Sequence, residues 1–140
     1  MRDCRGNFAL FFALLSPVLF GLAGGAVDLV IYERQQAHLQ DAVDAAALAA
    51  AREASLKGWN QTTADAVVRA MVGANTAGQS FSSVKFDPKV VVDEASRTVH
   101  VTLDMNQYSY FVLSYFRNNP QIRVKASATS SGETNVCIVA

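Results

Sequence analysis

Residues 6–52 read GNFALFFALLSPVLFGLAGGAVDLVIYERQQAHLQDAVDAAALAAAR, an apolar stretch that passes into an alanine-rich one. Its first part has no charged side chain over the 20 residues from Phe8 to Val27. A helix of that length spans about 30 Å, the thickness of the hydrocarbon core of a bilayer. A cleaved secretory signal has a shorter apolar region and a small-x-small cleavage site, of which LAGGAVD is a poor example. We therefore predict a retained transmembrane helix over residues 8–27.

The charges on either side of this segment predict its orientation. Arg2 and Arg5 precede it, whereas Asp28 and Glu33 follow it. Basic residues favour the cytoplasmic side of a membrane. The pattern places residues 1–7 in the cytoplasm and the chain beyond the span outside it.

Beyond the span, the helix is predicted to continue over residues 28–57, because nothing in the sequence breaks it before Gly58. An apolar stripe recurs along it at helical spacing: Leu29, Tyr32, Leu39, Val43, Ala46 and Ala50. Small side chains let helix backbones approach closely and lose little entropy when buried. We expect helix packing in the membrane at Gly21, Gly24 and Gly25, and outside it at Ala42, Ala46 and Ala50. Glu53 and Lys57 are spaced for an ion pair.

Residues 58–140 are predicted to form a small α+β domain. After the turn GWNQ, Thr62 with Asp65 three positions later resembles a capping box, which predicts a second, short helix. The residues expected on its buried face are Ala64, Val67, Val68 and Met71. GANTAGQS is expected to end it.

The sequence period then changes from helical to alternating. VKFDPKVVVDEASRTVHVTLDM predicts strand, turn and strand, and IRVKASATS predicts a third strand. The expected buried residues are Val99, Val101 and Leu103, and then Ile122, Val124, Ala126 and Ala128. Residues 108–116 fit helical spacing instead. A long helix, a short helix and about three antiparallel strands make an α+β fold.

Composition and motifs exclude several functions. The 12 basic and 12 acidic residues balance, which leaves no electrostatic basis for binding nucleic acid. His38 and His100 lie in no catalytic or phosphate-binding motif. His38 with Asp41 and Asp44 is more typical of a solvated helix face than of a metal site, and His100 is expected at the surface. We predict no cofactor, no metal and no enzymatic activity.

The two cysteines form no disulfide framework. Cys4 and Cys137 lie on opposite sides of the predicted span, so they cannot pair within one chain. The pairing state of Cys137 stays open.

The N-terminal 52 residues closely resemble TadG-like proteins of the TadE/TadG family, from the tight-adherence (Flp) pilus system. In that family a basic start and RGNFA precede the apolar segment, an aspartate closes it, and a run like DAVDAAALAAAR follows. The resemblance implies a minor pilin-like component of pilus assembly, with its domain in the periplasm. It also implies an anchor in the bacterial inner membrane and oligomeric contacts of the N-terminal helix with other Tad proteins or pilins.

One position departs from the prepilins of this system, which carry a glutamate five residues after the cleavage glycine. Counted from Gly6, that position holds Phe11. The departure favours the TadG type over TadE and TadF, and leaves open both cleavage after Gly6 and incorporation into a filament. Many TadG-like proteins continue into a large C-terminal region, so the end at CIVA is expected to mark a fragment of a longer protein or an abrupt end.

Two functions remain after these steps. The first is mechanical: the span anchors the protein, the alanine-rich helix packs laterally, and the sheet presents a recognition surface. The second is a membrane-tethered module in which residues 58–140 bind a peptide or a polysaccharide and the span is only a tether.

Overall fold

The computed structural model describes residues 6–77, 84, 86–106, 121–131 and 136–139. Its contacts divide the chain into two compact units. Of the residues described, the first comprises residues 6–34, and the second comprises those from 35 onward. The helix predicted over residues 108–116 falls outside the described residues.

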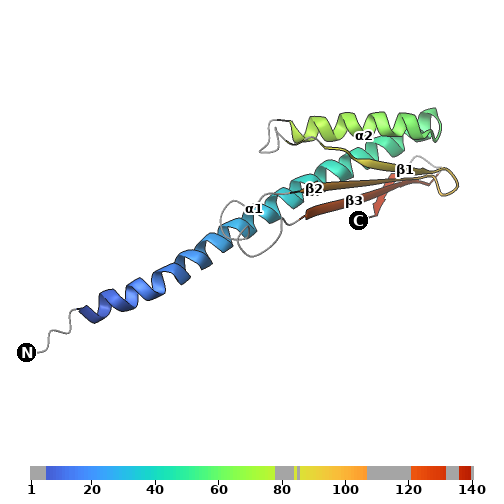
Figure 1. Ribbon diagram of the computed structural model, residues 1–140. Coiled ribbons are helices and arrows are strands. Elements are labelled where there is room, and N and C mark those ends of the chain that lie inside the picture. The colour runs from blue at the N-terminus through green and yellow to red at the C-terminus, as the bar shows by residue number, and fades with distance from the viewer. Residues whose placement is uncertain (1–5, 78–83, 85, 107–120, 132–135, 140) are drawn as a thin grey trace, which may run out of the picture. The chain divides into compact units, whose positions relative to one another are not determined.

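Helix α1 (Gly6–Lys57) has 52 residues and contains the continuous helix predicted over residues 8–57 (Figure 1). Its end is defined by Gly58, which adopts a φ of 98° and donates its N–H to the carbonyl O of Ala54 at 2.9 Å. A left-handed glycine after the last turn is a common helix stop, because glycine lacks the Cβ that disfavours this conformation. The predicted ion pair between Lys57 and Glu53 is present at 2.5 Å.

Helix α2 (Gln61–Thr76) begins after a different cap from the one predicted. Asn60 has an extended backbone, and its Oδ1 accepts hydrogen bonds from the N–H groups of Thr62 and Thr63 at 2.8 and 3.4 Å. The proposed capping role of Thr62 is therefore wrong, since that residue already lies in the first helical turn. Asn60 satisfies two of the amides that a helix start leaves unpaired.

The buried face of α2 is narrower than predicted. Ala64 and Val68 are buried as expected, but Val67 and Met71 are only half-buried. The remaining buried positions are Val72 and Thr76, so the buried residues recur every four positions. The helix ends at Thr76, within the stretch GANTAGQS that was predicted to end it.

Four antiparallel strands form one sheet in the order β1-β2-β3-β4. Their bounds are β1 (Lys89–Asp93), β2 (Thr98–Asn106), β3 (Gln121–Ser130) and β4 (Val136–Val139). The short β4 pairs with the last residues of β3 and adds to the strands expected from the alternating pattern. The predicted α+β fold is confirmed.

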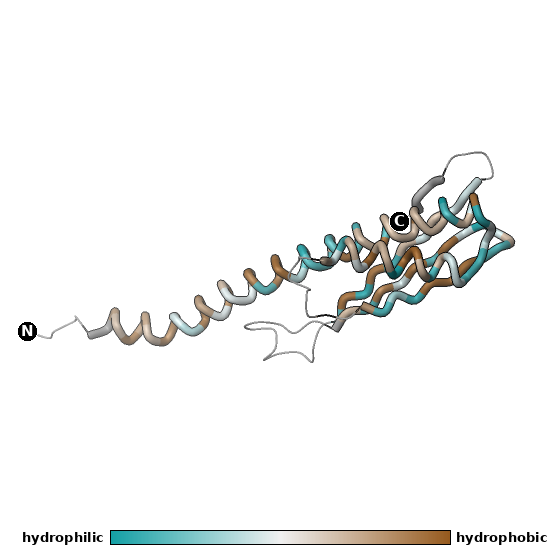
Figure 2. Tube along the Cα trace, turned by 90° about the horizontal axis from the view of Figure 1, so that it is seen from above, coloured by the Kyte–Doolittle hydropathy of each residue, from teal (hydrophilic) through white to brown (hydrophobic). Residues whose placement is uncertain are grey.

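The core of the second unit lies between helices and sheet. In the register of β2 with β3, Val99 faces Ala128 and Leu103 faces Val124, which places the predicted apolar residues on one buried face. Figure 2 shows the resulting alternation of hydrophobic and hydrophilic residues along the strands. The other face stays exposed, so the helices cover one side of the sheet. Helix α1 contributes the buried residues Leu39, Ala42, Val43, Ala46, Ala47, Ala50, Ala51 and Ala54.

Candidate functional site

In the first unit, α1 exposes large apolar side chains. Phe8, Leu14 and Phe20 are each more than 70% exposed, at 79%, 71% and 74%. Contiguous apolar surface of this kind is rare on proteins that are surrounded by water. Within the described residues, α1 is long and apolar enough to cross a membrane. The exposed surface is therefore suited to anchoring in lipid.

The three glycines predicted to pack in the membrane lie on this part of α1 and are partly covered. A Cβ built on Gly21 or Gly25 would meet no atom within 4 Å apart from the neighbouring residues and backbone of its own helix, so the surface beside each is open. These two glycines are about one helical turn apart and share a face. Asp28, one turn beyond Gly24, is 6% exposed. The face combines small residues with a buried carboxylate where the apolar run ends.

The alanines predicted to pack outside the membrane lie inside the chain's own domain. Ala42, Ala46 and Ala50 are at most 2% exposed. On the same segment, Gln40 donates from Nε2 to the carbonyl O of Lys125 at 2.9 Å, which fixes α1 against β3. Small side chains permit close packing of α1 inside the domain. A partner helix cannot reach them while the domain keeps this structure.

A groove of about 1270 Å³ opens in the second unit beside α1 and α2. Helix α1 supplies most of its wall, α2 contributes two apolar side chains, and the turn between β1 and β2 contributes Arg97. Its lining residues are Ala45, Leu48, Ala49, Arg52, Glu53, Ala54, Ser55, Leu56, Gly58, Trp59, Val67, Met71, Arg97 and Ser130. Sequence reasoning missed this groove, although a tryptophan in the turn GWNQ between two helices was a usable signal.

The turn between β1 and β2, which contributes Arg97 to the groove, is held by its own hydrogen bonds. Asp93 Oδ1 accepts from the N–H groups of Ala95 and Ser96 at 3.0 and 3.3 Å. Hydrogen bonds donated to the Asp93 carboxylate by the Ser96 hydroxyl and then by the Ser96 N–H lower the pKa of Asp93. Arg97 completes the turn with a φ of 51°, and its carbonyl O accepts from Ser130 N at 3.1 Å. These contacts fix the backbone that carries Arg97 at the groove.

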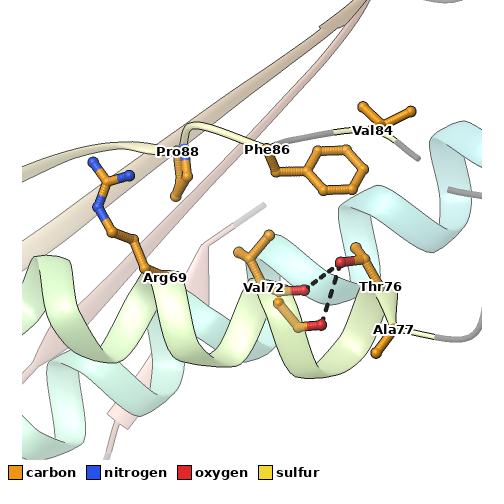
Figure 3. A pocket seen from close by; sticks show the side chains of 8 residues that line it. Arg69, Val72, Thr76, Ala77, Val84, Phe86 and Pro88 are labelled. Carbon is orange, nitrogen blue, oxygen red and sulfur yellow. Dashed lines mark hydrogen bonds between the residues drawn. The ribbon is translucent and has the colours of Figure 1, made fainter. Parts of the chain in front are cut away.

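A smaller cavity of about 360 Å³ lies between α2 and the segment that leads into β1. Figure 3 shows Phe86 and Val84 opposite Val72 and Thr76, with the Thr76 hydroxyl bonded to the Val72 carbonyl at 2.8 Å. Arg69 lines the cavity and bonds two carboxylates, Asp65 and Asp87, both at 2.7 Å.

These two carboxylates raise the pKa of the Arg69 guanidinium and compensate its charge. Arg69 therefore links α2 to the segment before β1. This structural role explains the arginine without a bound ligand.

The polar face of the sheet shows no catalytic arrangement among the described residues. His38 and His100 are exposed, as predicted, and His100 Nδ1 lies 2.6 Å from Ser127 Oγ. Asp104 pairs with Arg123 at 2.5 Å, and the hydrogen bond from Arg123 lowers the pKa of Asp104. No group of three or more His, Cys, Asp and Glu residues in the described part of the chain is placed to hold a metal ion.

The comparisons with known proteins locate the similarity in α1. No curated protein and no solved structure matches the chain significantly. Residues 6–53 match the model of the Tad family, described as "Putative Flp pilus-assembly TadE/G-like", which confirms the TadE/TadG resemblance predicted for this segment.

Proposed function

We propose that the protein is a minor pilin-like membrane component of a bacterial Tad (Flp) pilus assembly system, acting by helix packing rather than by catalysis. The observation that carries this proposal is the family match over residues 6–53, which is nearly coextensive with α1 (Gly6–Lys57). The exposed apolar side chains of the same helix support an anchoring role. The long helix would then carry the function, and the small domain would follow it in the sequence.

The proposed location is the bacterial inner membrane. Arg2 and Arg5 support a cytoplasmic N-terminus by the positive-inside tendency, which would leave the domain that contains the sheet in the periplasm. Fusing a periplasm-specific reporter after residue 140 tests this orientation. Reporter activity is expected at the C-terminus, and activity of a cytoplasmic reporter there would contradict it.

Partners are proposed to be other Tad assembly proteins or pilins, contacted in lipid through Gly21, Gly24 and Gly25. Small residues permit close helix approach in membranes, where dispersion and packing replace the hydrophobic effect as the driving force. The open surface beside Gly21 and Gly25 supports this assignment. For Ala42, Ala46 and Ala50 we propose packing of α1 against the protein's own sheet.

The test is crosslinking in native membranes that contain the other pilus assembly proteins. A Gly21→Leu, Gly25→Leu double variant is expected to lose crosslinked product about tenfold, because leucine side chains hold the helices apart. Ala23→Leu is the matched control, since Ala23 lies on a different face of the same helix and is exposed. Unchanged crosslinking in the double variant would refute the packing role.

The rival function, a tethered module for a peptide or polysaccharide, predicts a different result. Replacement of residues 8–27 by an unrelated transmembrane segment leaves a tethered binder active. A packing component loses pilus assembly under the same replacement.

A further inference from the structure

The groove beside α1 and α2 is large and apolar enough for a protein segment. Small-molecule pockets occupy roughly 300–1000 Å³, and the groove at about 1270 Å³ exceeds that range. Its wall includes Leu48, Ala49 and Met71, and Leu56 at its edge is 74% exposed. Methionine adapts to different partner shapes because its side chain is flexible and polarisable.

The charge at the groove is positive. Arg52 and Arg97 both line it, and neither forms an ion pair with any residue in the described ranges. The acidic residue in the wall, Glu53, is neutralised by Lys57 at 2.5 Å. The cavity beside α2 differs, since its Arg69 already binds two carboxylates. An occupant of the groove is therefore expected to bring carboxylates of its own.

Arg97 occupies a backbone position that favours another residue. Its φ of 51° lies in the left-handed region, where glycine and asparagine are common and other residues are rare. A glycine there would satisfy the turn with less strain. An arginine lines the groove from this position instead, and strained backbone of this kind clusters at binding and active sites.

Side chains partly cap two strand segments that lack a neighbouring strand: β1, and the part of β3 that β4 does not pair. Gln61 bonds the Val90 carbonyl and the Val92 amide on the outer edge of β1. Gln40 bonds the Lys125 carbonyl of β3. Capped edges disfavour pairing with an extended peptide, whereas an apolar groove lined by helices suits a helical ligand.

We propose that the groove binds an amphipathic helix of a partner protein, with leucine-sized side chains on the apolar wall and carboxylates toward Arg52 and Arg97. This rests on the assembly role proposed above and deepens it, because it names a second contact surface apart from the membrane helix. The recognition surface is then the groove and not the face of the sheet.

The experiment uses Trp59, the single tryptophan of the chain, as a fluorescent probe in the groove. Full-length protein in nanodiscs is titrated with two synthetic helical peptides without tryptophan. Both carry leucine at positions i, i+3, i+4 and i+7, flanked by glutamate in one peptide and by lysine in the other. The glutamate peptide is expected to shift Trp59 emission saturably and to bind at least tenfold more tightly than the lysine peptide. Absence of that shift, or equal binding of the two peptides, overturns the proposal.

The second part of the experiment reverses the charge of the two arginines in the groove. Arg52→Glu with Arg97→Glu is expected to invert the preference between the peptides. Arg34→Glu is the matched control, because Arg34 is an exposed cation of α1 outside the groove lining. An unchanged preference in the double variant, or the same inversion in the control, overturns the assignment of the arginines.

Arg97→Gly separates binding from folding. The variant removes the guanidinium and relieves the left-handed strain, so its unfolding midpoint is expected to stay level or rise while binding of the glutamate peptide falls about tenfold. Wild-type affinity in this variant contradicts a role for Arg97 in the groove.

The membrane crosslinking test distinguishes failure of this proposal from failure of the assembly role. Lost peptide binding with intact glycine-dependent crosslinking refutes the groove alone, and the reverse pattern refutes the packing role alone.

Discussion

The side-chain amide of Gln61 lies against the edge of β1, with Nε2 2.7 Å from the carbonyl O of Val90. The same amide accepts the N–H of Val92 through Oε1 at 3.0 Å. One side chain thus bonds two consecutive outward backbone groups, as a neighbouring strand would. The first residue of α2 protects the open edge of the sheet, which is the kind of device that prevents edge-to-edge association.

Gln61→Ala is expected to loosen this edge. Two hydrogen bonds are lost. Each contributes about 0.5–1.5 kcal/mol, and because both are exposed to water we use the lower value for each. We expect the free energy of unfolding to fall by about 1 kcal/mol, and hydrogen exchange at the Val92 amide to accelerate. Gln36→Ala is the control, because Gln36 is exposed on α1. Unchanged exchange at Val92 would contradict the capping role.

Asn60→Ala is expected to destabilise α2 by about 1 kcal/mol, the usual cost of losing an N-cap. Thr62→Ala is the matched comparison, since the sequence pattern assigns the cap to Thr62 and the structure assigns it to Asn60. Thermal unfolding of both variants decides between them. A larger loss for Thr62→Ala than for Asn60→Ala would restore the capping box.

Helix α1 and strands β2 and β3 were predictable from the sequence because one physical requirement sets the pattern of each. Uncharged residues over a bilayer's length predict the start of α1, and Gly58 predicts its end. Strict alternation in β2 and β3 predicts the face of the sheet that is buried, since a strand that packs on one side leaves its other side polar. In these segments local preference and tertiary packing agree.

The N-cap of α2 and the groove beside α1 and α2 could not be predicted from the sequence, because both depend on the three-dimensional arrangement of the chain. Asn60 and Thr62 are both good capping residues two positions apart, so backbone geometry decides between them. Val67 and Met71 lie beside the row of buried residues on α2. The sequence of α2 alone does not tell whether another element buries these two side chains. The alanine-rich face was recognisable from the sequence, whereas its burial inside the protein's own domain was not.

Ala46→Leu tests this burial directly. Ala46 is completely buried, and an added leucine side chain in a packed core costs about 1–3 kcal/mol through overpacking. Urea unfolding in detergent is expected to show this loss. Ala37→Leu, an exposed substitution on the same helix, is expected to leave stability within about 0.5 kcal/mol. Equal stability of the two variants would mean that Ala46 is not packed against the sheet.

The ion pair of Asp104 with Arg123 makes a prediction about acid stability. The hydrogen bond from Arg123 holds the pKa of Asp104 below its ordinary value of about 3.9. The folded state then binds fewer protons than the unfolded state near that pH. The stabilisation is complete above the ordinary pKa and is lost as the pH falls through the lower folded value. Asp93, whose pKa is lowered by Ser96, acts in the same direction.

Urea unfolding measured from pH 7 to pH 2 checks this sign. The wild-type protein is expected to lose stability as the pH falls below about 4, the region where free aspartate titrates. Asp104→Asn is expected to be less stable at pH 7 and to show a shallower decline, because it removes one of the titrating groups. Ser127→Ala is the control for the same exposed sheet face, since Ser127 bonds His100 and not Asp104. A decline as steep in Asp104→Asn as in the wild type would mean that this ion pair does not couple folding to pH.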